Sequence, residues 1–360
     1  MAALGEALTA AYAARDPEAL LGTYEALWLA AWGLAPGERR EAWRGEYADL
    51  SAGLTLDRAR LQAGGSGTWG ARGRAEVQAL THGARTFLAV CRWLWHQPPF
   101  AHVIDIGAGA GAASLAAWAS GTRTMHLVEV AEHPRALGRE LLQELGATVV
   151  ATPDLGPPTS AGAPTLVVAA YVANELPGGP NAARLLDWLR HGDALLVIEP
   201  ATRTSAQALS AARDGLIHAV TGPCTHGQPC PRREGDAWCH FTAPFPVGPV
   251  GRALMHEAGV DVGLMHASWL SLARPDAARP HAAQPTAGRV LERWGRPERR
   301  VYVSICSARG VERVAVKGRD VEHLGPVWPG AIVDVEALSS AEEKGDGRLF
   351  RRGLLPVLEP

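Results

Sequence analysis

Apolar residues recur at helical spacing through the first sixty or so residues of the chain. The stretches ALGEALTAAYAA, PEALLGTYEALWLAAWGL and ERREAWRGEYADL carry apolar stripes, and Asp-Pro and Pro-Gly pairs separate them. This pattern predicts an N-terminal helical region over residues 1–62. The glycine-rich stretch AGGSGTWGARGR then predicts a flexible joint, and a further helix is expected from Ala75 to Trp95.

Beyond residue 100 the pattern changes to short apolar runs that alternate with helical stretches. The runs HVIDI, TMHLVEV, ATVVATPDL, TLVVAAYVA and DALLVIEP predict five strands. Strands of this kind that alternate with helices are typical of an α/β fold with a parallel, doubly wound sheet. ASWLSLA predicts a sixth strand, and RRVYVSIC with VERVAVKG predicts an antiparallel hairpin further along.

These patterns divide the chain into three parts. After the helical region, the main domain is expected over residues 75–320, with a cysteine-rich insertion at residues 222–241. Residues 321–360 show no periodicity and are expected to form an irregular tail. The longest apolar runs fall well short of the roughly 20 residues that a membrane helix needs, and the N-terminus lacks a secretory or transit-peptide pattern. We therefore expect a soluble, cytoplasmic protein.

A glycine-rich turn follows the first expected strand, in VIDIGAGAGAAS. Asp105 lies inside the strand, Gly107, Gly109 and Gly111 precede a helix, and Glu129 ends the second strand. In a doubly wound sheet, ligands bind at the carboxyl ends of the strands near the first crossover. Glycines let a ligand approach the backbone, and a carboxylate about 20 residues further on accepts hydrogen bonds from ribose hydroxyls. The pattern predicts a cofactor that contains a ribose.

Two classes of cofactor suit such a turn. A dinucleotide needs a pyrophosphate cradle, usually GxGxxG, and gains nothing from the anionic Asp105. The cationic amino-acid end of S-adenosylmethionine would gain from it. DIGAGAG also resembles the first motif of class I methyltransferases, and the late hairpin resembles their reversed seventh strand. We therefore expect a class I, Rossmann-like methyltransferase fold that binds S-adenosylmethionine, with a ligand-free turn as the alternative.

Polar residues also follow two further strands. The fourth strand ends in AAYVANELP, and the resemblance to methyltransferases implies that Tyr171, Asn174 and Glu175 line the pocket beside the methyl donor. A buried Asn and Glu at a strand end could equally cap the next helix. Asp154, at the end of the third strand, is expected to meet the adenine.

The charge balance does not indicate a strongly basic nucleic-acid binder. The chain has 35 Lys and Arg residues, 37 Asp and Glu residues and a formal net charge of −2. Between Arg289 and Arg319, however, nine basic residues accompany three acidic ones, and this local excess could meet phosphate groups. Arginine is common throughout the chain, so the stretch alone is weak support for RNA binding.

Three of the five cysteines lie close together, in GPCTHGQPCPRREGDAWCHF. In a reducing compartment, clustered cysteines more often bind metal or do redox chemistry than form disulfides. Cys224, Cys230 and Cys239 are spaced more widely than the ligand pairs of zinc fingers. Prolines precede Cys224 and follow Cys230, and prolines beside ligating cysteines are familiar in iron–sulfur sites.

A metal site of this kind needs a fourth ligand from elsewhere in the chain. Cys91 falls in a predicted helix and is expected to be an ordinary core residue. Cys306 ends the strand VYVSIC, which the cysteine-rich loop could reach. His226 and His240 keep open a zinc site with three cysteines and one histidine.

Together these motifs resemble a known family. The pattern PC…PCP…WCHF with a distant VSIC and WPG, and the stretches IDIGAGAGAAS, YVANELP, VIEPATRTSAQALSAARDGL and WLSLARP, are similar to methyltransferase-like proteins of the mitochondrial small ribosomal subunit, of the Rsm twenty-two type, and their bacterial relatives. The resemblance covers roughly residues 84–334, although WPGA replaces a Trp-Gly-Asp ending. It implies a [4Fe–4S] cluster on Cys224, Cys230, Cys239 and Cys306, and association with small-subunit ribosomal RNA during ribosome assembly.

Two functions follow, and the sequence does not choose between them. The first is an S-adenosylmethionine-dependent methyltransferase that acts on small-subunit ribosomal RNA, for which no pattern assigns catalytic residues. The second is a non-catalytic assembly factor that binds S-adenosylmethionine and RNA. In either case a cluster, or a structural zinc ion in its place, would order the cysteine-rich loop.

Overall fold

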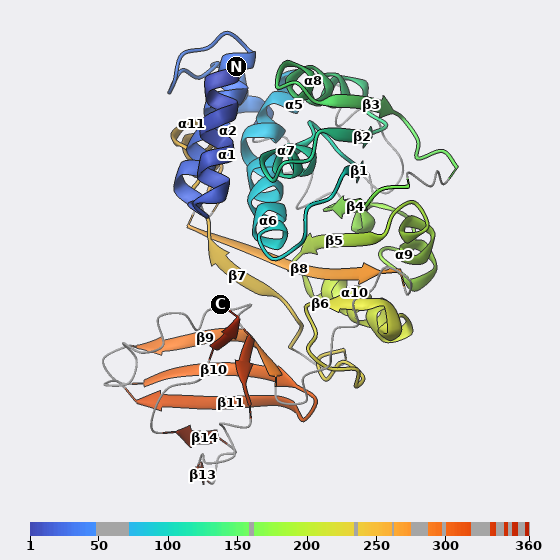
Figure 1. Ribbon diagram of the computed structural model, residues 1–360. Helices are drawn as coiled ribbons and strands as arrows, with labels where there is room; N and C mark the ends of the chain where they lie inside the picture. The colour runs from blue at the N-terminus through green and yellow to red at the C-terminus, as the bar shows by residue number, and fades with distance from the viewer. Residues whose placement is uncertain are drawn as a thin grey trace. The chain divides into compact units, whose positions relative to one another are not determined.

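The computed structural model describes most of the chain and divides it into two compact units (Figure 1). The first unit comprises Met1–Gly179, Leu186–Ile198 and Pro244–Met265, and the second comprises Pro180–Leu185, Glu199–Ala243 and His266–Pro360. The described residues are 1–47, 72–157, 162–233, 237–260, 263–274, 287–296, 300–317, 332–335, 342–344, 348–351 and 357–359. Whether residues 1–62, 75–320 and 321–360 fold as separate domains stays a prediction.

The chain begins with the expected helices, α1 (Ala2–Ala13) and α2 (Pro17–Ala31). Asp16 caps α2 because its Oδ1 accepts hydrogen bonds from the backbone N–H groups of Glu18 and Ala19, at 3.0 and 3.1 Å. These two helices pack on each other, α1 packs on α7, and α2 packs on α6 (Figure 1). Residues 63–71 of the predicted flexible joint lie outside the described residues. Its last three residues, 72–74, begin the next helix instead.

The helix expected from Ala75 to Trp95 is present but contains a change of pitch. It consists of α5 (Arg72–Gln78), a π-helical turn η2 (Ala79–Gly83) and α6 (Ala84–Leu94). Single π turns inside α-helices often mark functional sites. None of the helices in the described part of the chain is long and apolar enough to cross a membrane.

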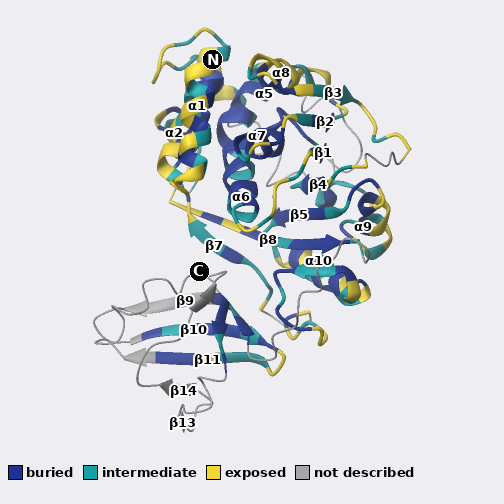
Figure 2. Cartoon of the chain, viewed as in Figure 1, coloured by how far each residue is buried: buried dark blue, intermediate teal, exposed yellow. Residues whose placement is uncertain are grey.

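A parallel sheet follows, as predicted, and its strand order β3-β2-β1-β4-β5 places the first crossover between β1 and β4. Figure 2 shows that β1, β4 and β5 are buried, which explains their nearly continuous apolar sequences. Helix α7 (Ala112–Ala119) packs on β1, and α8 (Glu132–Glu144) packs on β2 and β3. The five strands are β1 (His102–Ile106), β2 (Thr124–Val128), β3 (Thr148–Thr152), β4 (Thr165–Ala170) and β5 (Ala194–Pro200).

The sheet continues beyond β5 in the order β5-β8-β6, with β7 paired to β8. Strand β6 runs antiparallel to β8, so the sheet is mixed. The remaining elements of this part are β6 (Val220–Gly222), β7 (Phe241–Pro244), β8 (Leu264–Ala273), α9 (Ala182–Leu189), α10 (Arg203–Gly215), α11 (Pro249–Glu257), η3 (Ala173–Glu175) and η4 (Ile217–Ala219).

Our assignment of the late strands was wrong in one respect. ASWLSLA is part of β8, the strand between β5 and β6, whereas the hairpin formed by β10 (Arg300–Ser307) and β11 (Gly310–Lys317) is not in this sheet. The hairpin is antiparallel as predicted, but it belongs to a second sheet in which β9 (Ala287–Arg296) pairs with β10 on the other side. Local alternation identifies a hairpin, but it does not say which neighbours its outer edges will pair with.

The tail is also more regular than we predicted. Four short strands from it join the second sheet, whose order is β13-β14-β11-β10-β9-β12-β15. Strands of three or four residues carry too little periodicity to be detected in a sequence. They are β12 (Ile332–Asp334), β13 (Glu342–Lys344), β14 (Arg348–Arg351) and β15 (Val357–Glu359).

A buried carboxylate joins two distant helices of the first unit. Glu25 on α2 is 5% exposed, and its two carboxylate oxygens accept hydrogen bonds from the backbone N–H groups of Val250 and Gly251 at 3.1 and 2.8 Å. These N–H groups lie in the first turn of α11, where they have no partner within the helix and where the helix dipole favours an anion. Burial raises the pKa of Glu25, and the two backbone hydrogen bonds oppose that rise.

We expect Glu25→Ala to lower the free energy of unfolding by about 2 kcal/mol, because it removes both acceptors from buried N–H groups. Chemical denaturation followed by circular dichroism measures this change. Glu6→Ala, on the exposed face of α1, is the matched control and should leave the midpoint within error. Equal stabilities of the two variants would contradict the role given to Glu25.

Candidate functional site

The glycine-rich turn between β1 and α7 adopts a conformation that side chains would obstruct. Gly107, Gly109 and Gly111 have φ angles of +66°, +53° and +78°, which lie in the left-handed region that favours glycine. A Cβ atom on Gly107 would also lie 2.5 Å from Cγ2 of Val172, which is closer than non-bonded carbon atoms approach. The glycines are therefore required by the fold of the turn itself.

Glu129 closes the turn from the neighbouring strand. One of its carboxylate oxygens accepts a hydrogen bond from the backbone N–H of Gly109 at 2.9 Å, and the other accepts one from Ala131 at 2.8 Å. Its side chain is half-buried, and Arg135 donates to its backbone carbonyl oxygen. The structure thus brings Glu129 to the turn, and its predicted contact with ribose hydroxyls stays a prediction.

Asp105 lies behind the turn. It is 2% exposed, and its Oδ2 accepts hydrogen bonds from the backbone N–H and the hydroxyl of Ser114, at 3.0 and 2.9 Å. Burial raises the pKa of Asp105 to about 7, and the charge of Glu129 contributes to the rise while the bonds from Ser114 oppose it. We had assigned this carboxylate to the ammonium of a cofactor, but its observed partners tie the strand to α7.

The other predicted residues follow strand ends at the same edge of the parallel sheet. Tyr171 directly follows β4 with a φ of +60°, and its backbone N–H donates to the carbonyl oxygen of Ile198 at 2.6 Å. A non-glycine residue with this conformation is uncommon and is more frequent at functional sites. Asn174 and Glu175 lie in the 3₁₀ turn η3 and are half-buried, whereas Asp154 is exposed two residues beyond β3.

Sequence analysis did not identify two residues that contact the turn. Val172 packs against Gly107, and the carboxamide of Gln78 lies against Gly109, since a Cβ on that glycine would be 3.4 Å from Nε2 of Gln78. Gln78 precedes the glycine turn by a whole helix and belongs to no motif. Only the tertiary structure identifies it.

The second candidate site is formed by cysteines within the second unit. Cys224, Cys230 and Cys239 lie in the loop between β6 and β7, Cys306 lies on β10, and all four are free thiols. Burial raises the pKa of Cys239 well above its usual value, and the three other thiols raise it further. Burial likewise raises the pKa of Cys306 to about 12, again with contributions from Cys224 and Cys230. The four thiols that the resemblance implied are therefore close enough to interact electrostatically.

An ion pair at the end of α10 holds this loop, and the sequence analysis missed it. Arg213 is 2% exposed and donates hydrogen bonds to the backbone carbonyl oxygens of His226 and Gln228. It pairs with Asp214 at 2.7 Å, and Asp214 in turn accepts a hydrogen bond from the backbone N–H of Cys230 at 3.0 Å. Burial raises the pKa of Cys224, and the charge and hydrogen bond of Arg213 oppose that rise.

The two histidines considered as ligands are placed differently. His226 is 7% exposed, and its Nε2 lies 3.4 Å from Sγ of Cys306. His240 lies against the ring of Trp238 instead, with ring centroids 5.8 Å apart. Within the described residues, no group of three or more His, Cys, Asp or Glu side chains is arranged to hold a metal ion, so a metal-binding insertion is not established. The thiols converge, but a metal would have to draw them to ligand distance, about 2.3 Å for zinc.

Of the basic side chains between Arg289 and Arg319, the structure describes those of Arg289, Arg309 and Arg313. Arg289 is half-buried, and its charge opposes the raised pKa of Cys224. Arg309 pairs with Glu312 at 3.2 Å, and Arg313 is exposed on β11. The other basic side chains of this stretch fall outside those that the structure describes.

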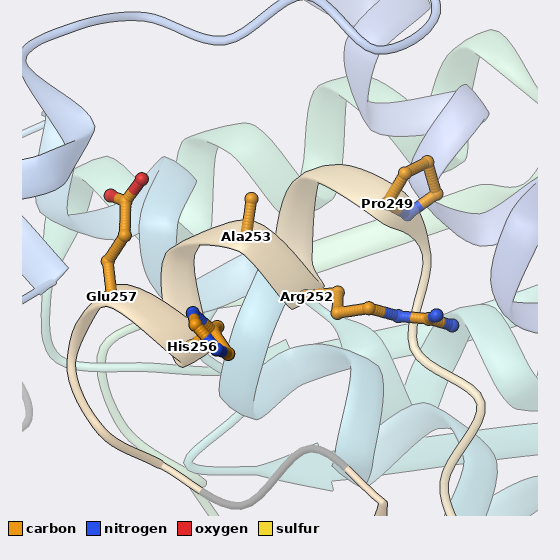
Figure 3. A pocket seen from close by; sticks show the side chains of 5 residues that line it. All are labelled: Pro249, Arg252, Ala253, His256 and Glu257. Carbon is orange, nitrogen blue, oxygen red and sulfur yellow. The ribbon is translucent and has the colours of Figure 1, made fainter.

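A shallow pocket lies elsewhere in the first unit, over one face of α11 (Figure 3). Pro249, Arg252, Ala253, His256 and Glu257 line it. Glu257 forms ion pairs with Arg39 and Arg44 at 2.6 and 3.2 Å. None of the residues predicted from the sequence borders this pocket, so it is not the candidate cofactor site.

The pKa of Asp105 leads to a prediction about pH. Because folding raises this pKa from 3.8 to about 7, the folded state binds a proton more tightly than the unfolded state does. The stabilisation is complete below about pH 4 and is lost as the pH rises towards 7. Asp105→Asn, which mimics the neutral acid, should flatten this part of the stability profile, whereas the exposed control Asp154→Asn should keep it. Denaturation at pH 4, 5.5 and 7 provides the test, and parallel profiles for wild type and Asp105→Asn would contradict it.

Several solved structures are similar to this chain at low sequence identity. The rRNA methylase from Escherichia coli is 16% identical over 59% of this chain and 89% of its own, with a TM-score of 0.31. The 16S rRNA methylase RmtB is 13% identical over 58% and 81%, with a TM-score of 0.30. TrmK of M. capricolum, in complex with S-adenosyl-homocysteine, is 6% identical over 51% and 67%, with a TM-score of 0.29. No curated protein matched the sequence.

The family comparison is decisive for classification. Residues 74–331, which include the π turn, the glycine turn and all four clustered cysteines, match the family described as mitochondrial small ribosomal subunit Rsm22. The match covers well over half of the chain. This protein belongs to the Rsm22 family.

Proposed function

We propose that this protein binds S-adenosylmethionine and acts on, or binds, the RNA of the small ribosomal subunit. The observation that carries the cofactor assignment is the turn of Gly107, Gly109 and Gly111, closed from the next strand by Glu129. Such a turn at the first crossover of a doubly wound sheet leaves backbone atoms open to a nucleoside ligand. Membership in the Rsm22 family supports the ribosomal partner.

The predicted residues other than Asp105 have a role in this proposal. We assign the remaining lone pairs of the Glu129 carboxylate to the ribose hydroxyls, and Asp154, exposed beyond the end of β3, to the adenine. Tyr171, Asn174 and Glu175 line the side from which an acceptor would approach. Bound S-adenosylmethionine supplies an electrophilic methyl group.

Methyl transfer requires mainly that the acceptor be held in line with the sulfonium. The left-handed conformation of Tyr171 fixes the chain beside Gly107 and thereby orients the residues that follow. No side chain is assigned as general base.

We also propose a metal centre on Cys224, Cys230, Cys239 and Cys306, as a [4Fe–4S] cluster or, alternatively, a zinc ion. The donor set supports this proposal because four mutually interacting, partly buried thiols form no disulfide, and the pKa values of three of them stay raised although Arg213, Arg232 and Arg289 oppose the rise. A metal would replace the thiol protons and cross-link the loop to β10, which gives the centre a structural role.

The cofactor proposal predicts that Gly107→Ala weakens S-adenosylmethionine binding by at least tenfold, because the new Cβ meets Val172 and the backbone must leave its conformation. Isothermal titration calorimetry measures the dissociation constant. Gly121→Ala is the matched control, since Gly121 also has a positive φ, +109°, but has open space around its Cβ position. Undiminished affinity in Gly107→Ala would refute the site.

The Gly107→Ala variant also distinguishes a methyltransferase from a non-catalytic assembly factor. Transfer of a tritiated methyl group to immature small subunits, lost in Gly107→Ala, supports the methyltransferase. Cofactor binding without transfer, together with normal subunit maturation in Gly107→Ala cells, supports the second function, a non-catalytic factor.

The metal proposal predicts that anaerobically purified protein is brown and contains about four iron atoms and four sulfides per chain. Serine substitution at any of the four cysteines should abolish the absorption near 400 nm, whereas Cys91→Ala, in the core of α6, should preserve it. A colourless protein that contains one zinc ion would show that the centre holds zinc and not a cluster. Absence of both metals would disprove the centre.

A further inference from the structure

Gln78 occupies a special position beside the glycine turn. It is the last residue of α5 and immediately precedes the π turn η2. Its carboxamide lies against Gly109, because a Cβ on that glycine would be 3.4 Å from Nε2 and 3.7 Å from Oε1 of Gln78. The side chain therefore borders the turn at the point where we place the cofactor.

The carboxamide oxygen of Gln78 is buried and has no hydrogen-bond partner among the residues that the structure describes. Leaving a buried acceptor unsatisfied costs about 1–3 kcal/mol, so such groups usually mark a missing ligand or water. The N–H of Gly109, the glycine beside this carboxamide, is already bonded to Glu129. A ligand bound at the turn would supply the missing donor.

Packing holds Gln78 in this position. The hydroxyl of Tyr24, on α2, donates to the carbonyl oxygen of Ala79 at 2.8 Å. A Cβ on Gly83 would lie 2.7 Å from the same hydroxyl and 3.6 Å from Cβ of Ala112, so the π turn fits tightly between α2 and the start of α7. The N-terminal helices thus fix the π turn, and the π turn directs Gln78 towards Gly109.

The chemistry expected of the ligand follows from the hydrogen-bond acceptors that remain available at the turn. We had expected Asp105 to meet the cationic end of S-adenosylmethionine, but its Oδ2 accepts both hydrogen bonds of Ser114 behind the turn. An ammonium group that approaches the turn needs an acceptor, and the oxygen of Gln78 is one. The Nε2 of the same carboxamide can donate to the carboxylate beside that ammonium.

We propose that Gln78 binds the amino-acid end of S-adenosylmethionine, with its oxygen accepting from the ammonium group. This inference rests on the proposed cofactor site. It assigns to the π turn a role in cofactor binding, and it makes the N-terminal helices part of the support of the site.

The test compares two ligands that differ only in the part that Gln78 would contact. S-adenosylhomocysteine carries the amino-acid end, whereas 5′-methylthioadenosine lacks it. Gln78→Met, which keeps the length of the side chain but loses the acceptor, should weaken S-adenosylhomocysteine binding about tenfold and leave methylthioadenosine binding unchanged. Gln78→Glu, which keeps acceptor oxygens for the ammonium but loses the Nε2 donor to the ligand carboxylate, should also weaken S-adenosylhomocysteine binding and leave methylthioadenosine binding unchanged.

Calorimetry on the full chain gives both dissociation constants, and Gln143→Met, exposed on α8, is the matched control. Equal weakening of the two ligands by Gln78→Met would show that Gln78 only supports the fold, and no weakening of either would show no contact; both results overturn the inference. If wild-type protein binds neither ligand, the cofactor site itself is wrong. Thermal melting verifies that each variant is folded.

Discussion

The first unit depends on a backbone turn that only glycine can form. At Gly107 the left-handed conformation coincides with the approach of Val172, so neither the backbone nor the space admits a side chain. Hydrogen bonds then lock this turn from two sides, since Ser114 binds Asp105 beneath it and Glu129 binds the N–H of Gly109 above it. Strand β1, helix α7 and strand β2 are thereby joined at one point. Rigid backbone of this kind is what a small ligand needs, because binding then requires little further ordering.

The helices before the sheet extend this rigidity. Tyr24 bonds to the π turn, and Glu25, its neighbour on α2, caps α11. Tyr24 and Glu25, in one turn of α2, therefore connect the π turn beside the glycine turn with α11. That helix lies more than 200 residues further along the chain. Both side chains are nearly inaccessible to solvent, so their hydrogen bonds lie in a medium of low dielectric constant, where an unsatisfied partner is costly.

The sequence predicted those features whose physical cause is local. The five parallel strands were recognisable because buried strands are continuously apolar, and the glycine turn because its conformation excludes other residues. The place of β8 between β5 and β6 could not be predicted, since strand order depends on pairing between distant segments. The same holds for Gln78 and for the pair of Arg213 and Asp214. These residues acquire their roles only when the chain brings a glycine turn or a cysteine loop against them.

The charges around the cysteine loop explain why a metal cation would change the protonation of its thiols. Burial and mutual repulsion raise the pKa of Cys239 and Cys306, so at neutral pH these thiols keep their protons. Arg213 is nearly fully buried beside Cys224 and pairs with Asp214, and the charges of Arg232 and Arg289 also oppose the raised pKa values of Cys239 and Cys224. Burial outweighs these cations, since the pKa values of the thiols stay raised. A divalent or cluster-bound metal would stabilise the thiolates, release their protons and draw the sulfurs together. Arg213 and Asp214 meanwhile hold the backbone at His226, Gln228 and Cys230, so the segment between Cys224 and Cys230 is held without a metal.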